Sequence, residues 1–302
     1  MKSVLKINEM ARENPLGLVE YSEEKYHDRL QEVASGIFEN EEKRIIMLAG
    51  PSASGKTTSA KLISQKLSDL GAKTYTISLD DFYRNRSETV DENGEPDFES
   101  VNALDVDLIK SCITELLTSG QTDLPLFDFV YGVRKKETKH LKIERNDAVI
   151  FEGIHALNPI ITGELPSENV LRLYVSVSSR ISASNGEIIM TKRDLRFVRR
   201  LVRDFYHRAS SVERTFELWD SVLEGEDKYI YPFSKSADER IDSFHSYEPC
   251  IFKSLAIPML ESVKVDSEFY VDAQRMIKKL SLFEKLDTSV TPETSLLNEF
   301  LR

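Results

Sequence analysis

The chain has 302 residues, of which 40 are Lys or Arg and 51 are Asp or Glu, so its formal net charge at pH 7 is −11. That length suffices for one large domain with appendages, and the acidic balance argues against nucleic acid or a membrane as a partner. Two cysteines, Cys112 and Cys250, are too few for a disulfide framework or a zinc site. We find neither a secretory signal nor an apolar run of membrane-spanning length, and therefore expect a cytoplasmic protein.

Residues 1–43 are expected to form a helical lead-in to the main domain. Within them, residues 22–40 have the period of an amphipathic helix that Ser22 would cap. We expect the apolar face to pack on the domain that follows, because no flexible linker separates the two. That face consists of Tyr26, Leu30, Val33 and Ile37.

The segment Gly50–Thr58 fits the pattern Gly-x-x-x-x-Gly-Lys-[Ser/Thr] of a phosphate-binding P-loop. It follows a short apolar run at 44–49, typical of a buried strand, and precedes apolar residues at helical spacing that end at Gly71. Strand, loop and helix in this order predict a site for a triphosphate and Mg²⁺ rather than a glycine-rich turn that happens to carry a lysine. Lys56 would reach the β- and γ-phosphates, and Thr57 would hold the metal. The expected nucleotide-binding residues are Gly50, Ser52, Ala53, Ser54, Gly55, Lys56, Thr57 and Thr58.

A second strand, predicted at 74–79, is followed by Asp80 and Asp81. In an open parallel sheet, ligands bind at the carboxyl ends of the strands, so a carboxylate here would face the phosphates. Strand alternation makes the two side chains point apart, and we expect only one of them to reach the metal or the substrate. The alternative is an aspartate that caps the next turn.

The polar and acidic stretch 84–100 predicts a solvated loop or a mobile flap over a site. A helix follows, with its apolar side between 108 and 117. The aromatic run 125–134 is either a strand and turn or a pocket for a flat or sugar-like ligand, because three rings stand there beside charged residues.

Residues 148–154 repeat the pattern of a buried strand and contain Glu152. A glutamate in an apolar strand is costly unless it is paired or lies near a cation, and P-loop enzymes commonly place a carboxylate here to organise Mg²⁺. Glu152 is therefore a candidate metal residue. A fourth strand is predicted at 171–177.

The concentrated basic element of the chain lies at 193–204. Apolar residues that include Phe205 share one helical face, and the opposite face gathers Arg196, Arg199, Arg200 and Arg203. These arginines either form a solvated face with ion pairs to Asp194 and Asp204 or belong to a lid, about 185–235, that closes over phosphates during phosphoryl transfer. Helices near 249–262 and 271–283 would complete a domain of residues 44–283, and the tail 284–302 is expected to be loosely held after Asp287.

Together these features resemble the uridine kinase branch of the phosphoribulokinase/uridine kinase family, over roughly residues 44–240. The resemblance is carried by Gly50–Thr58, Ser78–Tyr83, Phe127–Phe129 with Arg134, Phe151–Ile154, and the arginines Arg200, Arg203 and Arg208. Segments 14–21 and 91–94 are also similar to a bacterial subgroup of nucleoside kinases, which usually carries an N-terminal TGS-type domain that this sequence lacks.

The resemblance implies a P-loop α/β fold with a doubly wound, mostly parallel sheet, helices on both faces and an arginine-rich helical lid. It implies ATP- and Mg²⁺-dependent transfer of the γ-phosphoryl group to a hydroxyl of a small molecule, with a nucleoside as the expected acceptor. Asp80 becomes the base that accepts the hydroxyl proton, Glu152 supports the metal, and Tyr83 lines the acceptor site. The residues that would close over the phosphates are Arg200, Arg203 and Arg208. Family members often form oligomers, so a homo-oligomer is expected.

Several positions depart from the uridine kinase pattern. Glu99 stands where uridine kinases use an aspartate to hold the ribose hydroxyls. Phe127 and Gly132 stand where they place a tyrosine and a histidine against the pyrimidine, and the lid has Arg208-Ala209-Ser210 in place of Arg-Gly-Arg. The expected substrate residues are Tyr83, Glu99, Phe127, Phe129 and Arg134.

Two alternatives to a nucleoside kinase remain. One is a kinase of another polyol or of a sugar phosphate, whose phosphate would bind Arg134, Lys135 and Lys136. The other is a nucleotide-binding sensor without catalysis, and the joint presence of Lys56, Asp80 and Glu152 argues against it.

Overall fold

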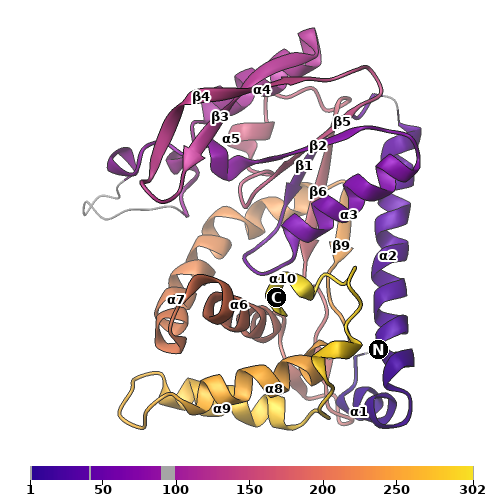
Figure 1. The fold of residues 1–302 in the computed structure, drawn as a ribbon, viewed down its shortest axis with the longest axis vertical. Helices are drawn as coiled ribbons and strands as arrows, with labels where there is room; N and C mark the ends of the chain where they lie inside the picture. The colour runs from indigo at the N-terminus through magenta and orange to yellow at the C-terminus, as the bar shows by residue number, and fades with distance from the viewer. Residues whose placement is uncertain (1, 41, 90–98, 302) are drawn as a thin grey trace.

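The computed structural model describes residues 2–40, 42–89 and 99–301. Its centre is a parallel five-stranded sheet with the strand order β2-β5-β1-β6-β9 (Figure 1). The predicted α/β class and the four predicted strands are confirmed, and β9 adds an edge that the sequence did not indicate. The strands of this sheet are β1 (Ile45–Ala49), β2 (Thr74–Ser78), β5 (Ala148–Glu152), β6 (Val170–Ser176) and β9 (Glu239–Asp242).

The register of the sheet determines where the candidate functional site lies. Alternate side chains of β1, such as Met47 and Leu48, enter two separate apolar cores, as expected for a strand that is buried on both faces. Leu48 pairs with Glu152, which in turn pairs with Ser78 on the next strand. The carboxyl ends of β1, β5 and β2 therefore lie level, and the loops that follow them meet at one edge.

Helices cover both faces of the sheet, as predicted. On one face lie α3 (Lys56–Asp69) and α2 (Pro15–Glu39), and α1 (Val4–Glu13) packs on the end of α2 that extends beyond the sheet (Figure 1). On the other lie α4 (Val106–Ser119) and the short α5 (Pro159–Thr162).

The helix predicted at 22–40 begins earlier than expected. Asn14 caps α2, because its side chain accepts a hydrogen bond from the backbone N–H of Gly17. The prediction that Ser22 caps this helix is wrong. Ser22 lies inside α2, where its hydroxyl donates to the carbonyl of Leu18.

The aromatic run 125–134 forms strand and turn, the simpler of its two interpretations. It joins β3 (Gln121–Asp128) to β4 (Val133–Lys142) in an antiparallel hairpin beyond the main sheet. A second small pair consists of β7 (Ile181–Ser182) and β8 (Ile188–Met190). Residues 90–98, which hold most of the predicted flap and the segment 91–94, lie outside the described part of the chain.

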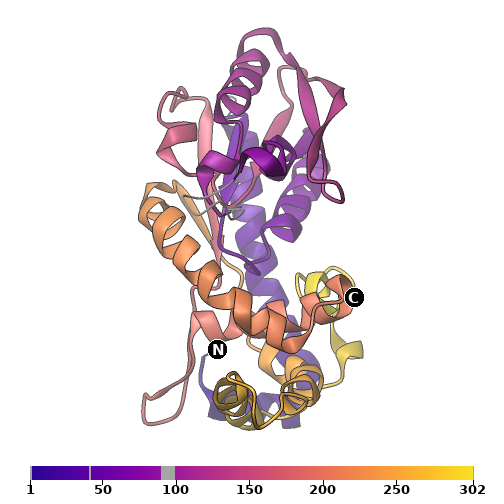
Figure 2. The same ribbon diagram turned by 90° about the vertical axis from the view of Figure 1, so that its left-hand side faces the viewer.

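The remaining helices form a layer beneath the sheet, at the opposite end of the molecule from the β3–β4 hairpin in both views (Figures 1 and 2). They are α6 (Lys192–Arg208), α7 (Val212–Tyr229), α8 (Glu248–Glu261), α9 (Tyr270–Ser281) and α10 (Asn298–Leu301). The helices predicted near 193–204, 249–262 and 271–283 are thus confirmed.

Two of the arginines on α6 have a structural role that the helical pattern did not reveal. Arg196 and Arg199 are almost completely buried and form ion pairs with Glu226 and Glu248, respectively. The interpretation of these two residues as part of a solvated or mobile face is therefore wrong. The assignment of Phe205 to the apolar face is also wrong, because 44% of this residue is exposed.

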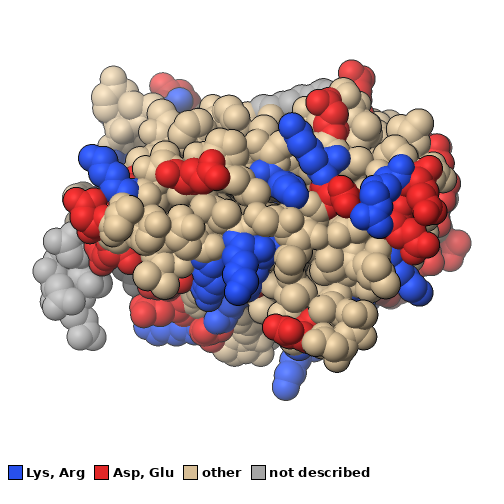
Figure 3. All heavy atoms as spheres, turned by 90° about the horizontal axis from the view of Figure 1, so that it is seen from below, with Lys and Arg blue, Asp and Glu red and all other residues tan. Residues whose placement is uncertain are grey.

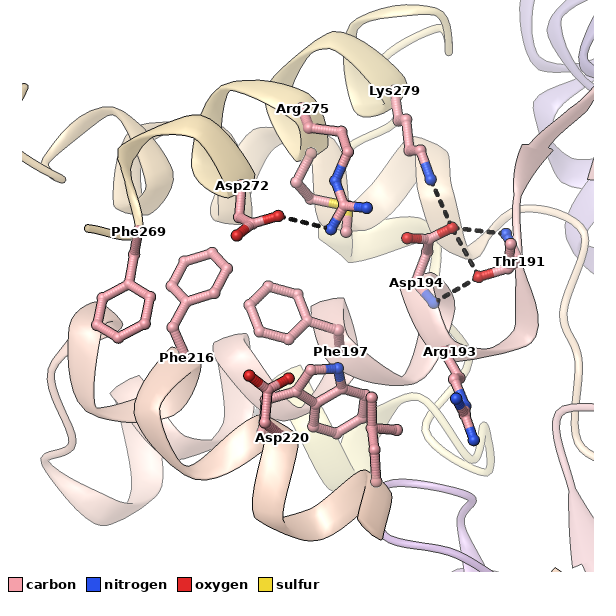
Figure 4. A pocket seen from close by; sticks show the side chains of 13 residues that line it. Thr191, Arg193, Asp194, Phe197, Phe216, Asp220, Phe269, Asp272, Arg275 and Lys279 are labelled. Carbon is pink, nitrogen blue, oxygen red and sulfur yellow. Dashed lines mark hydrogen bonds and ion pairs between the residues drawn. The ribbon is translucent and has the colours of Figure 1, made fainter. Parts of the chain in front are cut away.

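The other side of α6 packs against α7 and α9 around a cavity of about 320 Å³ (Figure 4). The ring centroids of Phe197 and Phe216 lie 4.6 Å apart there. Lys279 of α9 donates to Asp194, which also closes the capping box of α6 with Thr191. Helix α6 is therefore held on both sides.

The segment that follows α9 is packed, so the prediction of a tail loosely held after Asp287 is wrong. Leu296, Leu297 and Phe300 are fully buried. The guanidinium carbon of Arg199 lies 5.3 Å from the centroid of the Phe300 ring. The apolar side chains of the segment that follows α9 thus belong to the same core as those of α6 and α8.

The surface and the cysteines agree with the composition. On the face seen from below, basic and acidic side chains alternate in small groups (Figure 3). Cys112 and Cys250 are both buried and free. None of the helices in the described part of the chain is long and apolar enough to span a membrane.

The buried ion pair of Arg199 gives a prediction about stability. Arg199→Met should lower the free energy of unfolding by about 3–5 kcal/mol, because it leaves Glu248 as a buried, unpaired charge. The matched control is Arg214→Met, which breaks an exposed pair with Glu217 and should cost about 1 kcal/mol or less. Urea unfolding measures both. Equal losses in the two variants would contradict the structural role of Arg199.

His155 gives a prediction about pH. The residue follows β5, is 1% exposed, and has a pKa that burial lowers to about 4, an effect that the nearby Glu99 backbone only partly offsets. Between pH 6.5 and pH 4, His155 binds a proton in the unfolded chain but stays neutral in the folded chain. The free energy of unfolding therefore falls as the pH falls from 6.5 towards 4.

The decrease in the free energy of unfolding that is due to His155 should approach about 1.4 kcal/mol per pH unit. Urea unfolding at several pH values should show a shallower decline in His155→Phe than in the original protein. Parallel declines in the two proteins would show that this histidine does not carry the effect.

Candidate active site

The loops at the carboxyl ends of β1, β2 and β5 enclose a cavity of about 440 Å³ together with α6, α7 and the segment that contains α10. The cavity brings together the P-loop, two carboxylates from the strand ends and three arginines from α6. The predicted site residues that line it are Ser52, Ala53, Ser54, Gly55, Lys56, Thr57, Asp80, Tyr83, Glu99, Glu152, Arg200, Arg203 and Arg208. Those that do not line it are Gly50, Thr58, Phe127, Phe129 and Arg134.

The two P-loop glycines are required by the backbone. A Cβ on Gly50 would lie 2.0 Å from the carbonyl oxygen of Val175, so no larger residue fits. Gly55 has a φ of +85°, and a Cβ there would lie 2.3 Å from Leu296. The helix α3 begins directly afterwards, at Lys56, so its free N–H groups face the loop and favour an anion.

Three arginines of α6 contact the P-loop itself. Arg196 donates to the carbonyl of Ser52 at 3.2 Å, and Arg199 donates to the carbonyl of Ala53 at 3.4 Å. Arg200 donates to the hydroxyl of Ser52 at 2.9 Å. The loop is therefore fixed from the outside by guanidinium groups, two of which are also held in buried ion pairs.

Asp80 and Glu152 both line the cavity, and they lie close enough for their charges to interact. Loss of bulk water raises the pKa of the Asp80 carboxyl, and Lys56 and Arg208 partly offset this. The pKa of Glu152 is raised in the same way and further by Asp80, while Lys56 lowers it. The side chain of Asp80 stays open to solvent through the cavity. The hydroxyl of Thr57 donates to Glu152 at 3.3 Å.

These three side chains fit Mg²⁺. Two carboxylates with raised pKa values and a hydroxyl are hard oxygen ligands, and a divalent cation between them would relieve their repulsion. The described residues contain no cluster of three or more His, Cys, Asp or Glu side chains that could hold a metal by themselves. Mg²⁺ would accordingly take its other ligands from water and phosphate, as is usual for this ion.

The two adjacent aspartates do point apart, but they lie in a 3-10 turn (Leu79–Phe82) after β2 and not in the alternating strand on which the prediction relied. Asp80 lines the cavity, whereas the carboxylate of Asp81 accepts a hydrogen bond from the backbone of Phe127. The next turn is capped by Ser78, whose hydroxyl accepts from the N–H of Asp80. The alternative in which an aspartate caps this turn is therefore not supported.

Arg200, Arg203 and Arg208 share the carboxylate of Asp204, at 3.1, 2.8 and 3.6 Å. Burial and the neighbouring cations lower the pKa values of Arg200 and Arg208. One carboxylate cannot neutralise three guanidinium groups. Glu99 also acts on Arg200 through its charge, and Asp80 and Glu299 act on Arg208. The guanidinium groups on this wall could form charge-assisted hydrogen bonds with a polyphosphate.

Of the residues predicted to bind the acceptor, Tyr83 and Glu99 line the cavity, and those of the hairpin do not. The ring of Phe127 lies 5.9 Å from that of Tyr83, centroid to centroid, so it supports this wall from behind. Phe129 is 55% exposed. Arg134 donates to the carboxylate of Asp105 and to the backbone carbonyls of Phe82 and Tyr83.

Gly132 has a φ of +68°, and a Cβ there would lie 2.7 Å from Nε of Arg86. The side chain of Arg86 therefore fills the space beside this glycine. A side chain at position 132 would be strained by the positive φ and would require Arg86 to move.

The sequence did not identify several residues of the cavity wall. Glu226 lies there but pairs with Arg196, so it serves the fold. Glu299 lies there as well, although it belongs to the segment predicted to be loose. In the sequence, the signal that could have indicated a packed segment is the presence of three apolar residues within five positions. These are Leu296, Leu297 and Phe300, and all three are buried in the structure. The other missed wall residues are Gly153, Ile154, Val222 and Ile230.

Comparison with known sequences shows the family of this chain. The family described as "Phosphoribulokinase / Uridine kinase family" matches residues 45–247. The uridine kinase of Bacillus pumilus is 30% identical over 196 residues, which cover 64% of this chain and 83% of that protein. The uridine kinase of Chloroflexus aurantiacus is 31% identical over 197 residues, covering 64% and 84%.

Among solved structures, a possible uridine kinase from Bacillus stearothermophilus has 19% identity and a TM-score of 0.45, covering 71% of this chain and 98% of that one. The family match spans most of the chain, from β1 to the start of α8, and contains the P-loop, both strand-end carboxylates and the lid arginines. The chain belongs to the phosphoribulokinase/uridine kinase family.

Proposed function

We propose that this protein is an ATP- and Mg²⁺-dependent kinase that transfers the γ-phosphoryl group to a hydroxyl of a small molecule, with a nucleoside as the acceptor. The observation that carries the proposal is the composition of one cavity. A P-loop lysine and three arginines that share the carboxylate of Asp204 line it together with two strand-end carboxylates whose pKa values are raised. That arrangement suits a polyphosphate on one side and a metal with a base on the other.

The phosphates of ATP would bind the P-loop and the arginines. The backbone N–H groups of the loop and the start of α3 favour the anion, Lys56 would contact the outer phosphates, and Arg203 and Arg208 would cover them. Phosphoryl transfer places charge on the equatorial oxygens, so fixed cations at this position stabilise the transition state more than the ground state.

Mg²⁺ would be held by Thr57, Asp80 and Glu152, and it would neutralise charge on the phosphates. Asp80 would also accept the proton of the acceptor hydroxyl. That oxygen forms a bond to the γ-phosphorus as the bond between this phosphorus and the leaving oxygen of ADP breaks. The products are ADP and a phosphate ester.

For the acceptor, Tyr83 and Glu99 are the candidate contacts, and a glutamate can accept hydrogen bonds from two sugar hydroxyls. The relatives named uridine kinase support a nucleoside. The sugar-phosphate alternative is less well supported, because Arg134, Lys135 and Lys136 do not line the cavity. The positions of Phe127, Phe129 and Arg134 favour a supporting role for these residues, behind Tyr83. A cytoplasmic location, a homo-oligomer and the domain limits at 43 and 283 stay predictions.

Asp80→Asn tests this proposal. The variant should bind ATP much as the original protein does, because the P-loop and the arginines are intact, but should lose turnover by a factor of about 10²–10⁴ or more. Nucleotide binding by calorimetry and ADP release by a coupled assay measure the two effects. Lys56→Ala is the matched control and should lose binding as well.

Full turnover in Asp80→Asn would remove Asp80 from the reaction. Unchanged ATP binding in Lys56→Ala would contradict the nucleotide site itself.

A further inference from the structure

The segment 288–301 forms one wall of the phosphate site. It lies beyond the region matched by the family, which ends at residue 247. Leu296 is fully buried and packs so closely on the P-loop that any side chain at Gly55 would collide with it. The hydroxyl of Ser295 lies 3.0 Å from that of Tyr247, which itself donates to Glu23 on α2. The segment is therefore anchored to both the core and the N-terminal helix.

This anchoring places one carboxylate in the cavity. Glu299 lines the same space as Lys56 and Arg208. Its Oε2 accepts a hydrogen bond of 2.6 Å from the hydroxyl of Thr58, the residue after the predicted metal ligand Thr57. Within the described residues, Oε1 of Glu299 has no hydrogen-bond partner. One acceptor oxygen is thus fixed beside the P-loop and available to a ligand.

The chemistry of this oxygen restricts what it can bind. Ionised phosphate oxygens are hydrogen-bond acceptors, and so is a carboxylate, so Glu299 cannot bond to the phosphates of a nucleotide. It needs a ligand group that carries a proton. In a nucleoside triphosphate the donors nearest to the phosphates are the hydroxyls of the sugar.

We infer that Glu299 is a specificity-determining residue of the nucleotide site, whose carboxylate accepts hydrogen bonds from the sugar hydroxyls of the phosphoryl donor. The inference rests on the proposed function, because it assumes that the P-loop holds a nucleoside triphosphate. Thr58 and the buried side chains around Glu299 hold the carboxylate in place before the ligand arrives, which lowers the entropic cost of binding. A site of this kind discriminates against analogues that lack the hydroxyls.

Calorimetric titration with three Mg²⁺ complexes tests the inference: ATP, 2′,3′-dideoxy-ATP and inorganic tripolyphosphate. Glu299→Ala should weaken binding of ATP by about 10- to 100-fold, the usual range for a hydrogen bond to a charged group. It should leave the other two ligands unchanged. In the original protein, the dideoxy nucleotide should already bind about as weakly as ATP binds to the variant.

Two further variants serve as controls. Glu293→Ala changes an exposed carboxylate in the same segment and should alter none of the three affinities. Glu299→Gln keeps the shape of the side chain and an acceptor for Thr58, so it should fold normally, as judged by its thermal unfolding midpoint, and should show a smaller loss for ATP alone.

Four results would overturn the inference. Equal losses for all three ligands would mean that the segment only supports the loop, and tighter binding of all three would mean that the carboxylate only opposes the phosphates. Equal losses for ATP and its dideoxy analogue, with tripolyphosphate unchanged, would assign Glu299 to the base. No change at all would leave it a packing residue.

A failure of the proposed function looks different. In that case the original protein would bind none of the three ligands, or Lys56→Ala would bind them equally well. Either result would overturn the proposed function and this inference together.

Discussion

Two guanidinium groups buried on α6 hold the phosphate-binding loop in its position. Arg196 and Arg199 are each neutralised by a buried glutamate, and each also donates to a P-loop carbonyl. A buried charge is tolerated only when it is paired and hydrogen-bonded. The ion pairs therefore join α6, α7 and α8 to the loop, so the geometry of the phosphate site depends on helices more than 140 residues further along the chain.

This arrangement divides the arginines of α6 between two tasks. Those at 196 and 199 are fixed and have no charge to spare for a ligand, whereas Arg200, Arg203 and Arg208 share a single carboxylate and face the cavity. A lid that closes over phosphates would accordingly involve the later part of α6 and not its buried first turns. The contact between Lys279 of α9 and Asp194 further restricts movement of the first turn of α6.

The sequence predicted the sheet and most of its active edge for physical reasons. Apolar runs such as 45–49 and 148–152 have few alternatives to a buried strand, and the P-loop pattern fixes the order strand, loop, helix. Parallel strands then bring Asp80 and Glu152 to the loop without further assumptions.

What the sequence could not show depends on packing between distant elements. Helical spacing places Arg196 and Arg200 on neighbouring parts of one face, but only the position of Glu226 on α7 decides which of them is buried. In the same way, nothing in the spacing of the last residues connects Glu299 to Thr58, 241 positions earlier. The acceptor side was the hardest to predict, because the aromatic run of the hairpin supports the wall of the cavity and does not form it.

The proposed activity is the transfer of a phosphoryl group from ATP to a nucleoside in this cavity. The most direct measurement is ADP release from Mg²⁺-ATP in the presence of uridine, cytidine, purine nucleosides, free sugars, polyols and sugar phosphates, with the phosphate ester identified by mass spectrometry. We predict that at least one nucleoside accelerates ADP release and appears as its monophosphate. Turnover with another polyol and none with a nucleoside would contradict the choice of acceptor, and ADP release that no acceptor accelerates would contradict the assignment as a kinase of small molecules.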